Sequence, residues 1–178
     1  MSGFVVAAEL AEGDSGGASW HLRILERDVP DGLRPLLTEL GRLRAAGVLF
    51  AMVCVEDDWC ALVRPGPRGP QLLLSDASVV VEDDDEPGIG LARDILDELD
   101  VDGPTDDDID DADDPDAPWP EGDFDILTDL GVSDQVFSVI LDDGEMLATE
   151  QLMRLAEELG FDDDLADILD TLGYSGWE

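Results

Sequence analysis

Apart from its carboxylates, the chain has few side chains that could act as nucleophiles or metal ligands. It contains two cysteines, Cys54 and Cys60, and one histidine, His21. These residues are too few for a metal site, and the cysteines flank a predicted hairpin turn. We expect two buried free thiols, because unpaired cysteines usually behave as small hydrophobic residues; a redox or metal role is the alternative. A three-residue turn would place the thiols opposite each other, whereas a two- or four-residue turn would put them on opposite faces.

No recognisable set of catalytic residues is present. His21 has no nucleophile at a recognisable spacing, so we expect a surface histidine on a strand. Gly88-Ile89-Gly90 does not follow a predicted strand, which argues against a nucleotide-binding loop. The aspartate runs lack the glycine and glutamate positions of a calcium loop, and the chain has no lysine. We therefore expect no catalytic residue, no cofactor and no bound metal, and hence no enzyme.

Charge is distributed very unevenly along the chain. The net charge of −37 divides into −4 for residues 1–81 and −33 for residues 82–178. The second part divides again into −19 for residues 82–123 and −14 for residues 124–178. A surface this negative repels nucleic acid and anionic membranes, so neither is an expected partner. A basic protein is the expected partner instead.

The first 81 residues have the pattern of an α+β domain. Alternating apolar residues at Trp20, Leu22 and Ile24 indicate a half-buried strand, and leucines between 33 and 43 follow helical spacing behind Asp31 as N-cap. We expect an antiparallel sheet of about five strands with one helix packed on it. The strands are predicted at residues 4–10, 20–24, 48–55, 59–63 and 71–74.

The acidic half divides into two segments. Residues 82–123 are expected to be a largely flexible linker with a short helix at 89–99, because few apolar residues remain to offset the ordering entropy. Residues 124–178 are expected to form a small acidic helical module that needs a surface to pack on. Thr149 and Asp162 are predicted N-caps. Leu-Gly pairs at 130–131, 159–160 and 172–173 predict the helix ends.

Two groups of charged residues are candidates for binding. The carboxylates expected to meet a basic partner are Asp83, Asp84, Asp85, Asp106, Asp107, Asp108, Asp162, Asp163 and Asp164. The arginines that could form a basic patch, docking the chain's own acidic tract or an acidic partner, are Arg23, Arg27, Arg34, Arg42 and Arg44. The alternative for the arginines is that they are ordinary solvated side chains.

The sequence predicts a soluble cytoplasmic protein. Its first residues contain no positively charged segment of the kind that begins a signal peptide. No apolar stretch approaches the length of about 20 residues that spans a bilayer. Two cysteines are also too few for a disulfide framework.

Several short strings along the chain carry a family resemblance. They are the strand at 4–10, the hairpin Val-Glu-Asp-Asp-Trp-Cys-Ala-Leu-Val-Arg at 55–64, the Leu-Ser-Asp-Ala step at 74–77, the acidic middle, and Leu-Gly-Phe-Asp-Asp-Asp-Leu at 159–165. With these features the chain resembles the actinobacterial family of tRNA adenosine deaminase-associated proteins. The resemblance implies association with the deaminase and offers no catalytic residues. The chain also lacks the His-x-Glu and Pro-Cys-x-x-Cys motifs of the zinc deaminases, so it is not the deaminase itself.

The function expected from these features is that of a non-enzymatic accessory or regulatory protein. Its acidic half would bind a basic protein partner, with the tRNA adenosine deaminase as the partner that the resemblance implies. Three alternatives remain at this point. The chain could be a general polyanion that mimics nucleic acid and inhibits another nucleic-acid-binding protein, a structural domain with a solubilising acidic tail, or an enzyme that uses carboxylates with a divalent ion. The oligomeric state is left open.

Overall fold

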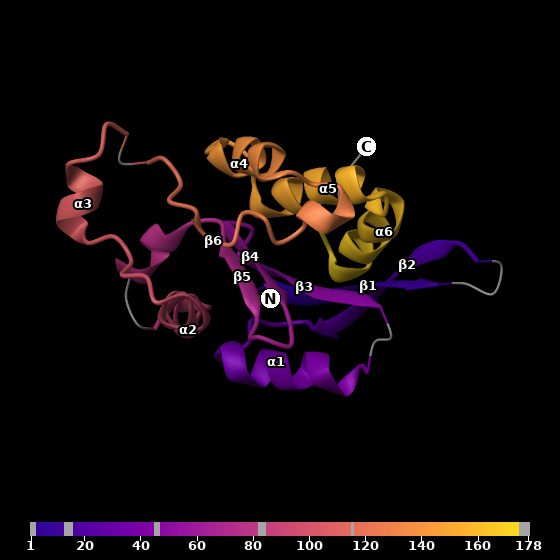
Figure 1. Ribbon diagram of the computed structural model, residues 1–178. Coiled ribbons are helices and arrows are strands. Elements are labelled where there is room, and N and C mark those ends of the chain that lie inside the picture. The colour runs from indigo at the N-terminus through magenta and orange to yellow at the C-terminus, as the bar shows by residue number, and fades with distance from the viewer. Residues whose placement is uncertain (1–2, 13–15, 45–46, 82–84, 115, 175–178) are drawn as a thin grey trace.

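A six-stranded antiparallel sheet forms the middle layer of the protein, and helices cover both of its faces (Figure 1). The computed structural model describes residues 3–12, 16–44, 47–81, 85–114 and 116–174. The strands lie in the spatial order β2-β1-β3-β4-β5-β6. Their bounds are β1 Gly3–Glu12, β2 Ala18–Glu26, β3 Val48–Val55, β4 Trp59–Arg64, β5 Gln71–Leu74 and β6 Glu121–Gly122.

The residue pattern of each strand reflects its place in the sheet. β1 and β3 pair with each other in the interior, with Ala7 opposite Ala51, and helices cover both of their faces. Their residues therefore form continuous apolar runs, as is usual for strands buried on both sides. β2 is an edge strand whose Leu22 is partly buried while Arg23 is exposed, which explains its alternating pattern. The five strands expected from the sequence are all present.

One face of the sheet is covered by three elements. They are α1 (Leu33–Arg42), the 3₁₀ helix η1 (Ala77–Val81) and α2 (Ile89–Leu99), the last of which confirms the helix predicted at 89–99. The prediction that Asp31 caps α1 was wrong. The N-cap is Gly32, and the Leu33 N–H donates to Asp94 Oδ2 of α2 at 3.0 Å, so the cap comes from another helix.

The other face is covered by the C-terminal helices α4 (Asp134–Asp142), α5 (Ala148–Leu159) and α6 (Asp162–Leu172). Their apolar residues share one core with Phe4, Phe50 and Met52 of the sheet, so the sheet is the surface on which the acidic helical module packs. The three predicted helix ends are confirmed, because the glycines of the Leu-Gly pairs adopt left-handed C-caps after the 3₁₀ helix η2 (Thr128–Leu130), α5 and α6.

An aromatic contact joins α5 and α6 to the sheet. Phe161 follows α5 and precedes α6 in the chain, and its ring centroid lies 5.0 Å from that of Trp20 on β2 and 6.4 Å from that of Phe50 on β3. The Trp20 indole N–H donates to the Leu159 carbonyl at 3.0 Å. Edge-to-face contacts of this kind add to the stabilisation from buried area. The end of α5 is therefore one of the places where the C-terminal layer is attached to the sheet.

The acidic segment between the two parts also contributes to the sheet. β6 pairs with β5, so the sheet has six strands where five were expected. Next to this pairing, Asp123 Oδ2 accepts a hydrogen bond from the Leu72 N–H at 3.0 Å. Gly122 has a φ of +129°, and a Cβ on it would lie 2.3 Å from the Leu72 carbonyl oxygen, so only glycine fits there. Regular pairing thus resumes before residue 124. The domain boundaries at 81 and 123, and the flexibility of the segment between them, stay predictions.

An ion pair on the sheet's surface predicts a dependence of stability on pH. Arg64 of β4 binds both carboxylate oxygens of Asp129 at 2.7 and 2.8 Å, and these hydrogen bonds lower the pKa of Asp129. Because the folded pKa lies below the unfolded value, this stabilisation is complete above the ordinary pKa of about 4 and is lost as the pH falls through the lowered value. Asp129 is 56% exposed, so solvent screening limits the effect.

We therefore expect Asp129→Asn to lower the free energy of unfolding by at most about 1 kcal/mol at pH 7, and by progressively less at acid pH. Urea denaturation of the wild type and the variant at several pH values measures this. Asp142→Asn, at the exposed end of α4, is the control and should show no such loss at pH 7. A deficit of the Asp129 variant that did not shrink in acid would contradict the assignment.

Within the described part of the chain, no helix is both long enough and apolar enough to cross a membrane.

Candidate protein interaction surface

The two cysteines face each other across the hairpin between β3 and β4. Cys54 is the register partner of Cys60, and Val55 pairs with Trp59 around a three-residue turn, so one of the predicted alternatives is confirmed. Both thiols are free and buried. Burial raises the pKa of Cys54 and raises that of Cys60 to about 12. Such thiols stay protonated at neutral pH and are poor nucleophiles.

Buried polar groups next to these thiols connect the hairpin to α5. Asp57 Oδ1 in the turn accepts hydrogen bonds from both the backbone N–H and the hydroxyl of Thr149, each at 2.7 Å. The Cys60 thiol donates to Gln151 Oε1 at 3.6 Å, and the Cys60 N–H donates to the Ser75 hydroxyl at 2.8 Å. Among the described residues, every buried side-chain nitrogen or oxygen has a partner. The arrangement fixes α5 on the sheet and offers a ligand no unpaired group.

This contact also corrects a predicted cap. Thr149 was expected to begin the helix, but α5 starts at Ala148, and Thr149 is a donor to Asp57 rather than the cap. The Ala148 N–H donates to the Asp57 carbonyl oxygen at 3.2 Å, so the hairpin turn satisfies two of the free N–H groups at this helix end. Asp162 was also expected to be a cap and is instead the first residue of α6, behind Phe161.

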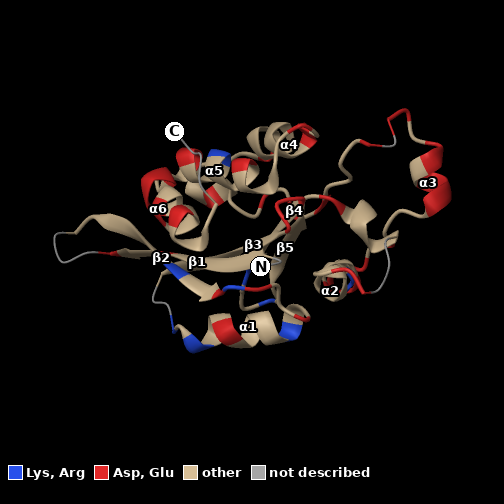
Figure 2. Ribbon diagram, turned by 180° about the vertical axis from the view of Figure 1, so that it is seen from behind, with Lys and Arg blue, Asp and Glu red and all other residues tan. Residues whose placement is uncertain are grey.

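The predicted partner-binding carboxylates are spread over separate surfaces. α3 (Asp106–Asp110) and α6 lie at opposite ends of the molecule, which Figures 1 and 2 show from opposite sides. The aspartates of each run lie together in the first turn of their helix, where carboxylates are favoured by the helix dipole. Asp85 is exposed between η1 and α2, and Asp83 and Asp84 lie outside the described residues.

The members of each acidic run differ in what they contact. Asp106, Asp107 and Asp108 are all exposed, and Asp108 Oδ2 also accepts from the N–H and hydroxyl of Thr105 at 2.9 and 3.0 Å. These hydrogen bonds lower the pKa of Asp108, which therefore stabilises its own short helix. In α6, Asp163 and Asp164 are exposed and Asp162 is half-buried. The two pairs to test for contact with a partner are therefore Asp106 with Asp107 and Asp163 with Asp164.

The five candidate arginines lie on the side of the sheet that carries α1. Arg34 and Arg42 belong to α1, Arg23 is on β2, Arg27 follows β2, and Arg44 follows α1; all five are exposed. In Figure 2 blue segments gather along α1 and the adjoining end of β2, while most red segments lie on the other helices. The arginines are therefore concentrated around α1, although α2 on the same face of the sheet carries Asp94, Asp97 and Glu98.

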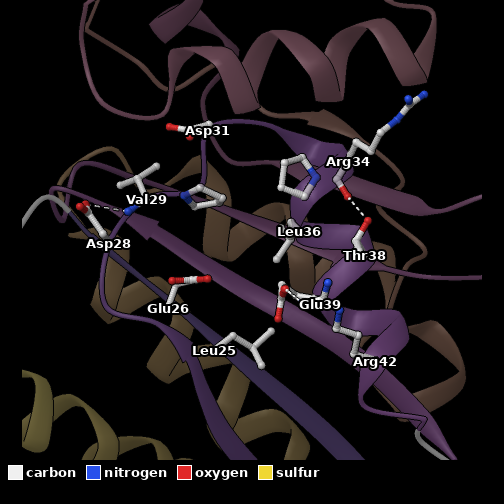
Figure 3. A pocket seen from close by; sticks show the side chains of 12 residues that line it. Leu25, Glu26, Asp28, Val29, Asp31, Arg34, Leu36, Thr38, Glu39 and Arg42 are labelled. Carbon is white, nitrogen blue, oxygen red and sulfur yellow. Dashed lines mark hydrogen bonds and ion pairs between the residues drawn. The ribbon is translucent and has the colours of Figure 1, made fainter.

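A groove with a volume of about 530 Å³ lies between α1 and the chain that leaves β2 (Figure 3). Arg42 binds Glu39 at 2.6 Å inside it, whereas the Arg34 side chain extends away from the groove. The lining includes two arginines and the carboxylates of Glu26, Asp28, Asp31 and Glu39. The groove itself does not carry a positive charge. Docking of an acidic segment on the arginines stays a prediction.

The sequence analysis missed a surface between α4 and α5. Val136 and Val139 on α4 are 37% and 72% exposed, and Leu147 at the start of α5 is 51% exposed. A hollow of about 440 Å³ lies beside the two valines and is closed on its other side by Arg154 and Glu158 of α5. The sequence did contain a signal for this surface, because α4 carries apolar residues in addition to the stripe that faces the core.

Comparison with known proteins places the chain in a family. Residues 3–162 match the family model described as Rv3753c-like tRNA adenosine deaminase-associated protein. The chain is 39% identical over 171 residues to "Protein Rv3753c" of Mycobacterium tuberculosis (strain ATCC 25618 / H37Rv), an alignment that covers 96% of this chain and 90% of that protein. No solved structure matches the chain significantly. The chain belongs to the Rv3753c-like tRNA adenosine deaminase-associated protein family.

Proposed function

We propose that this protein is a non-enzymatic accessory protein that binds a basic protein partner through the acidic surface of its C-terminal half. The tRNA adenosine deaminase of the same organism is the partner that the family description suggests. Complementary charge raises the association rate and selects between partners. The proposal thus combines a family description with a surface property of the chain.

The observation that carries the proposal is an acidic surface held on folded helices. Residues 82–178 contain 35 acidic residues and two arginines, Arg93 and Arg154, so most of the carboxylates have no cation of their own segment to pair with. Most carboxylates of α6 are exposed, as are those of the α4–α5 connection, and the other faces of α4, α5 and α6 are buried against the sheet. Such a surface presents negative charge in a defined shape.

An acidic surface of this kind is suited to binding a partner protein that itself binds tRNA. Proteins that bind nucleic acid use lysine and arginine to contact phosphates, so their binding surfaces are basic. An acidic protein that occupies such a surface competes with the RNA phosphates. We infer that this protein regulates or protects the deaminase by covering its RNA-binding surface, and that the complex weakens as salt concentration rises.

Features of the described residues favour binding over catalysis. The two thiols are protonated and buried, and they lie in a polar cluster whose groups are already bonded to each other. Among the described residues, no group of three or more histidine, cysteine or acidic side chains is arranged to hold a metal ion. The role proposed for the carboxylates is therefore contact with a partner.

The proposal is tested by measuring the equilibrium binding of the full chain to purified deaminase at low and physiological salt, with and without tRNA. We expect saturable binding that tRNA displaces and that salt weakens. Two variants with equal charge change separate the surfaces: Asp106→Asn with Asp107→Asn in α3, and Asp163→Asn with Asp164→Asn in α6. All four side chains are exposed, so both variants should fold.

If only one variant loses affinity, that helix contributes to the interface. Equal small losses in both would indicate that long-range attraction acts without either helix in contact. No binding of the wild type at low salt overturns the deaminase as partner. Equal affinity for unrelated basic proteins would instead support the general polyanion alternative.

A further inference from the structure

An exposed apolar surface lies on α4, next to a hollow shared with α5. Val136, Val139 and Ile140 occupy one face of α4 at helical spacing, and Asp143 follows one turn later on the same face. Val139 is 72% exposed, more than the other large apolar side chains among the described residues. Met146 from the α4–α5 connection completes the apolar part of the hollow.

The core packing of α4 does not require these valines. Phe137, Ile140 and Leu141 supply the buried face of the helix. A helix that needed only to cover the sheet would carry polar residues at 136 and 139, because the usual pattern is a single apolar stripe. An apolar patch with a polar rim marks a binding surface more often than a scattered exposed side chain does.

The rim of this hollow determines what could fill it. Asp143 and Glu158 line its two sides, and Arg154 is the single cation in the lining. Arg154 lies 3.6 Å from Glu157, which partly neutralises it. Four more exposed carboxylates lie on the same two helices and on the connection between them: Asp134, Asp142, Glu145 and Glu157. The surface is therefore apolar at its centre and negative around its edge.

We propose that the hollow between α4 and α5 is a docking site for an amphipathic helix of a basic protein partner. This inference rests on the proposed function and specifies its contact surface. The partner helix would place apolar side chains against Val136, Val139 and Met146, in the helix-in-groove mode of peptide recognition. Arginine or lysine on the flanks of that helix would meet Asp143 and Glu158.

Charge selects this occupant over a second copy of the chain. Each copy carries a net charge of −37, and α4 and α5 of both copies would bring their acidic rims together. Like charges brought together across an interface are unfavourable, whereas a basic helix gains from the same rim. Nucleic acid is disfavoured for the same electrostatic reason.

The experiment uses a synthetic probe so that it does not depend on the identity of the partner. The probe is an amphipathic peptide of about 18 residues, roughly five helical turns, with leucines on one face and arginines on its flanks. It is titrated into the full chain labelled at its valine, isoleucine and methionine methyl groups, and methyl NMR follows the binding. A second peptide has the same leucines with glutamates in place of the arginines.

We expect saturable shifts at Val136, Val139, Ile140 and Met146 with the basic peptide, and much weaker binding of the acidic one. Val139→Ala should weaken the basic peptide about tenfold, the effect of losing roughly two buried methyl groups. Alanine is a better helix former than valine, so the variant should fold. Val81→Ala, at an exposed valine on η1, is the matched control and should bind as the wild type does.

Shifts that spread over other surfaces and spare these methyl groups would overturn the inference, as would unchanged affinity in Val139→Ala. Dimerisation of the full chain that Val139→Ala abolishes would assign the hollow to a second copy and overturn it as well. The two proposals can fail separately. If the peptide binds here but the deaminase does not bind, the named partner is wrong; if the deaminase binds and Val139→Ala has no effect on either ligand, the docking site is wrong.

Discussion

Phe161→Ala is expected to lower the free energy of unfolding by about 3–5 kcal/mol, the range for removing a buried phenylalanine ring. Phe161 is 1% exposed, and its ring contacts those of Trp20 and Phe50. Because these contacts join the end of α5 to β2 and β3, the cavity opens between the C-terminal layer and the sheet. The loss is a large share of the stability of a domain of this size.

Urea denaturation, followed by circular dichroism and by methyl NMR, measures this loss. Phe161→Leu is the control, since it keeps most of the apolar volume, and it should cost markedly less. If the sheet and the C-terminal helices form one cooperative unit, both probes report the same midpoint for each variant. A loss below about 1 kcal/mol in Phe161→Ala would show that the layer is held mainly by other contacts.

Substitution of Asp57 is expected to have the second-largest effect. Its side chain accepts two hydrogen bonds from Thr149, which is fully buried, so removing the acceptor leaves donors without partners. The lost cap and the unpaired donors together predict a destabilisation of about 2–3 kcal/mol for Asp57→Ala. Asp57 also has a φ of +60°, a conformation that alanine adopts less readily than aspartate.

Three variants at this position separate the two causes. Asp57→Asn keeps an oxygen acceptor and tolerates the left-handed conformation, so it should cost less than about 1 kcal/mol. Asp57→Gly removes the acceptor without the conformational strain, and should lie between the other two. The same urea measurement ranks them. If alanine and asparagine destabilised equally, the contact with Thr149 would not be the reason for the loss.

The sequence predicted well the elements whose signal lies in neighbouring residues. Continuous apolar runs located β1 and β3, and alternation located β2. The helix α2 was visible from its spacing despite its acidic surroundings. Glycine after leucine located three helix ends correctly, because the left-handed C-cap is a local conformation.

Features that depend on residues far apart in the chain were not predictable in this way. The N–H groups at the starts of α1 and α5 are satisfied by Asp94 and Asp57, which are distant in sequence, so local rules named Asp31 and Thr149 instead. β6 has only two residues and carries no strand signal of its own; it exists because β5 offers it an open edge.

The candidate binding surfaces, too, were only partly predictable from the sequence. Composition was sufficient to identify an acidic half and to predict that nucleic acid is disfavoured as a partner. It could not show which of the exposed carboxylates accept hydrogen bonds within their own fold, as Asp108 does. The exposure of the α4 valines was not predicted, because only the packed structure shows which face of the helix meets the sheet.

The order in which the two layers are made has a consequence for synthesis on the ribosome. β1 to β5 are complete by Leu74, but the helices that cover Phe4, Phe50 and Met52 extend to Leu172. At about 5–20 residues per second, the nascent sheet waits about 5–20 s for its second layer. During that time the first 81 residues have a net charge of only −4 to oppose aggregation, so the nascent chain is most vulnerable before its acidic half has emerged.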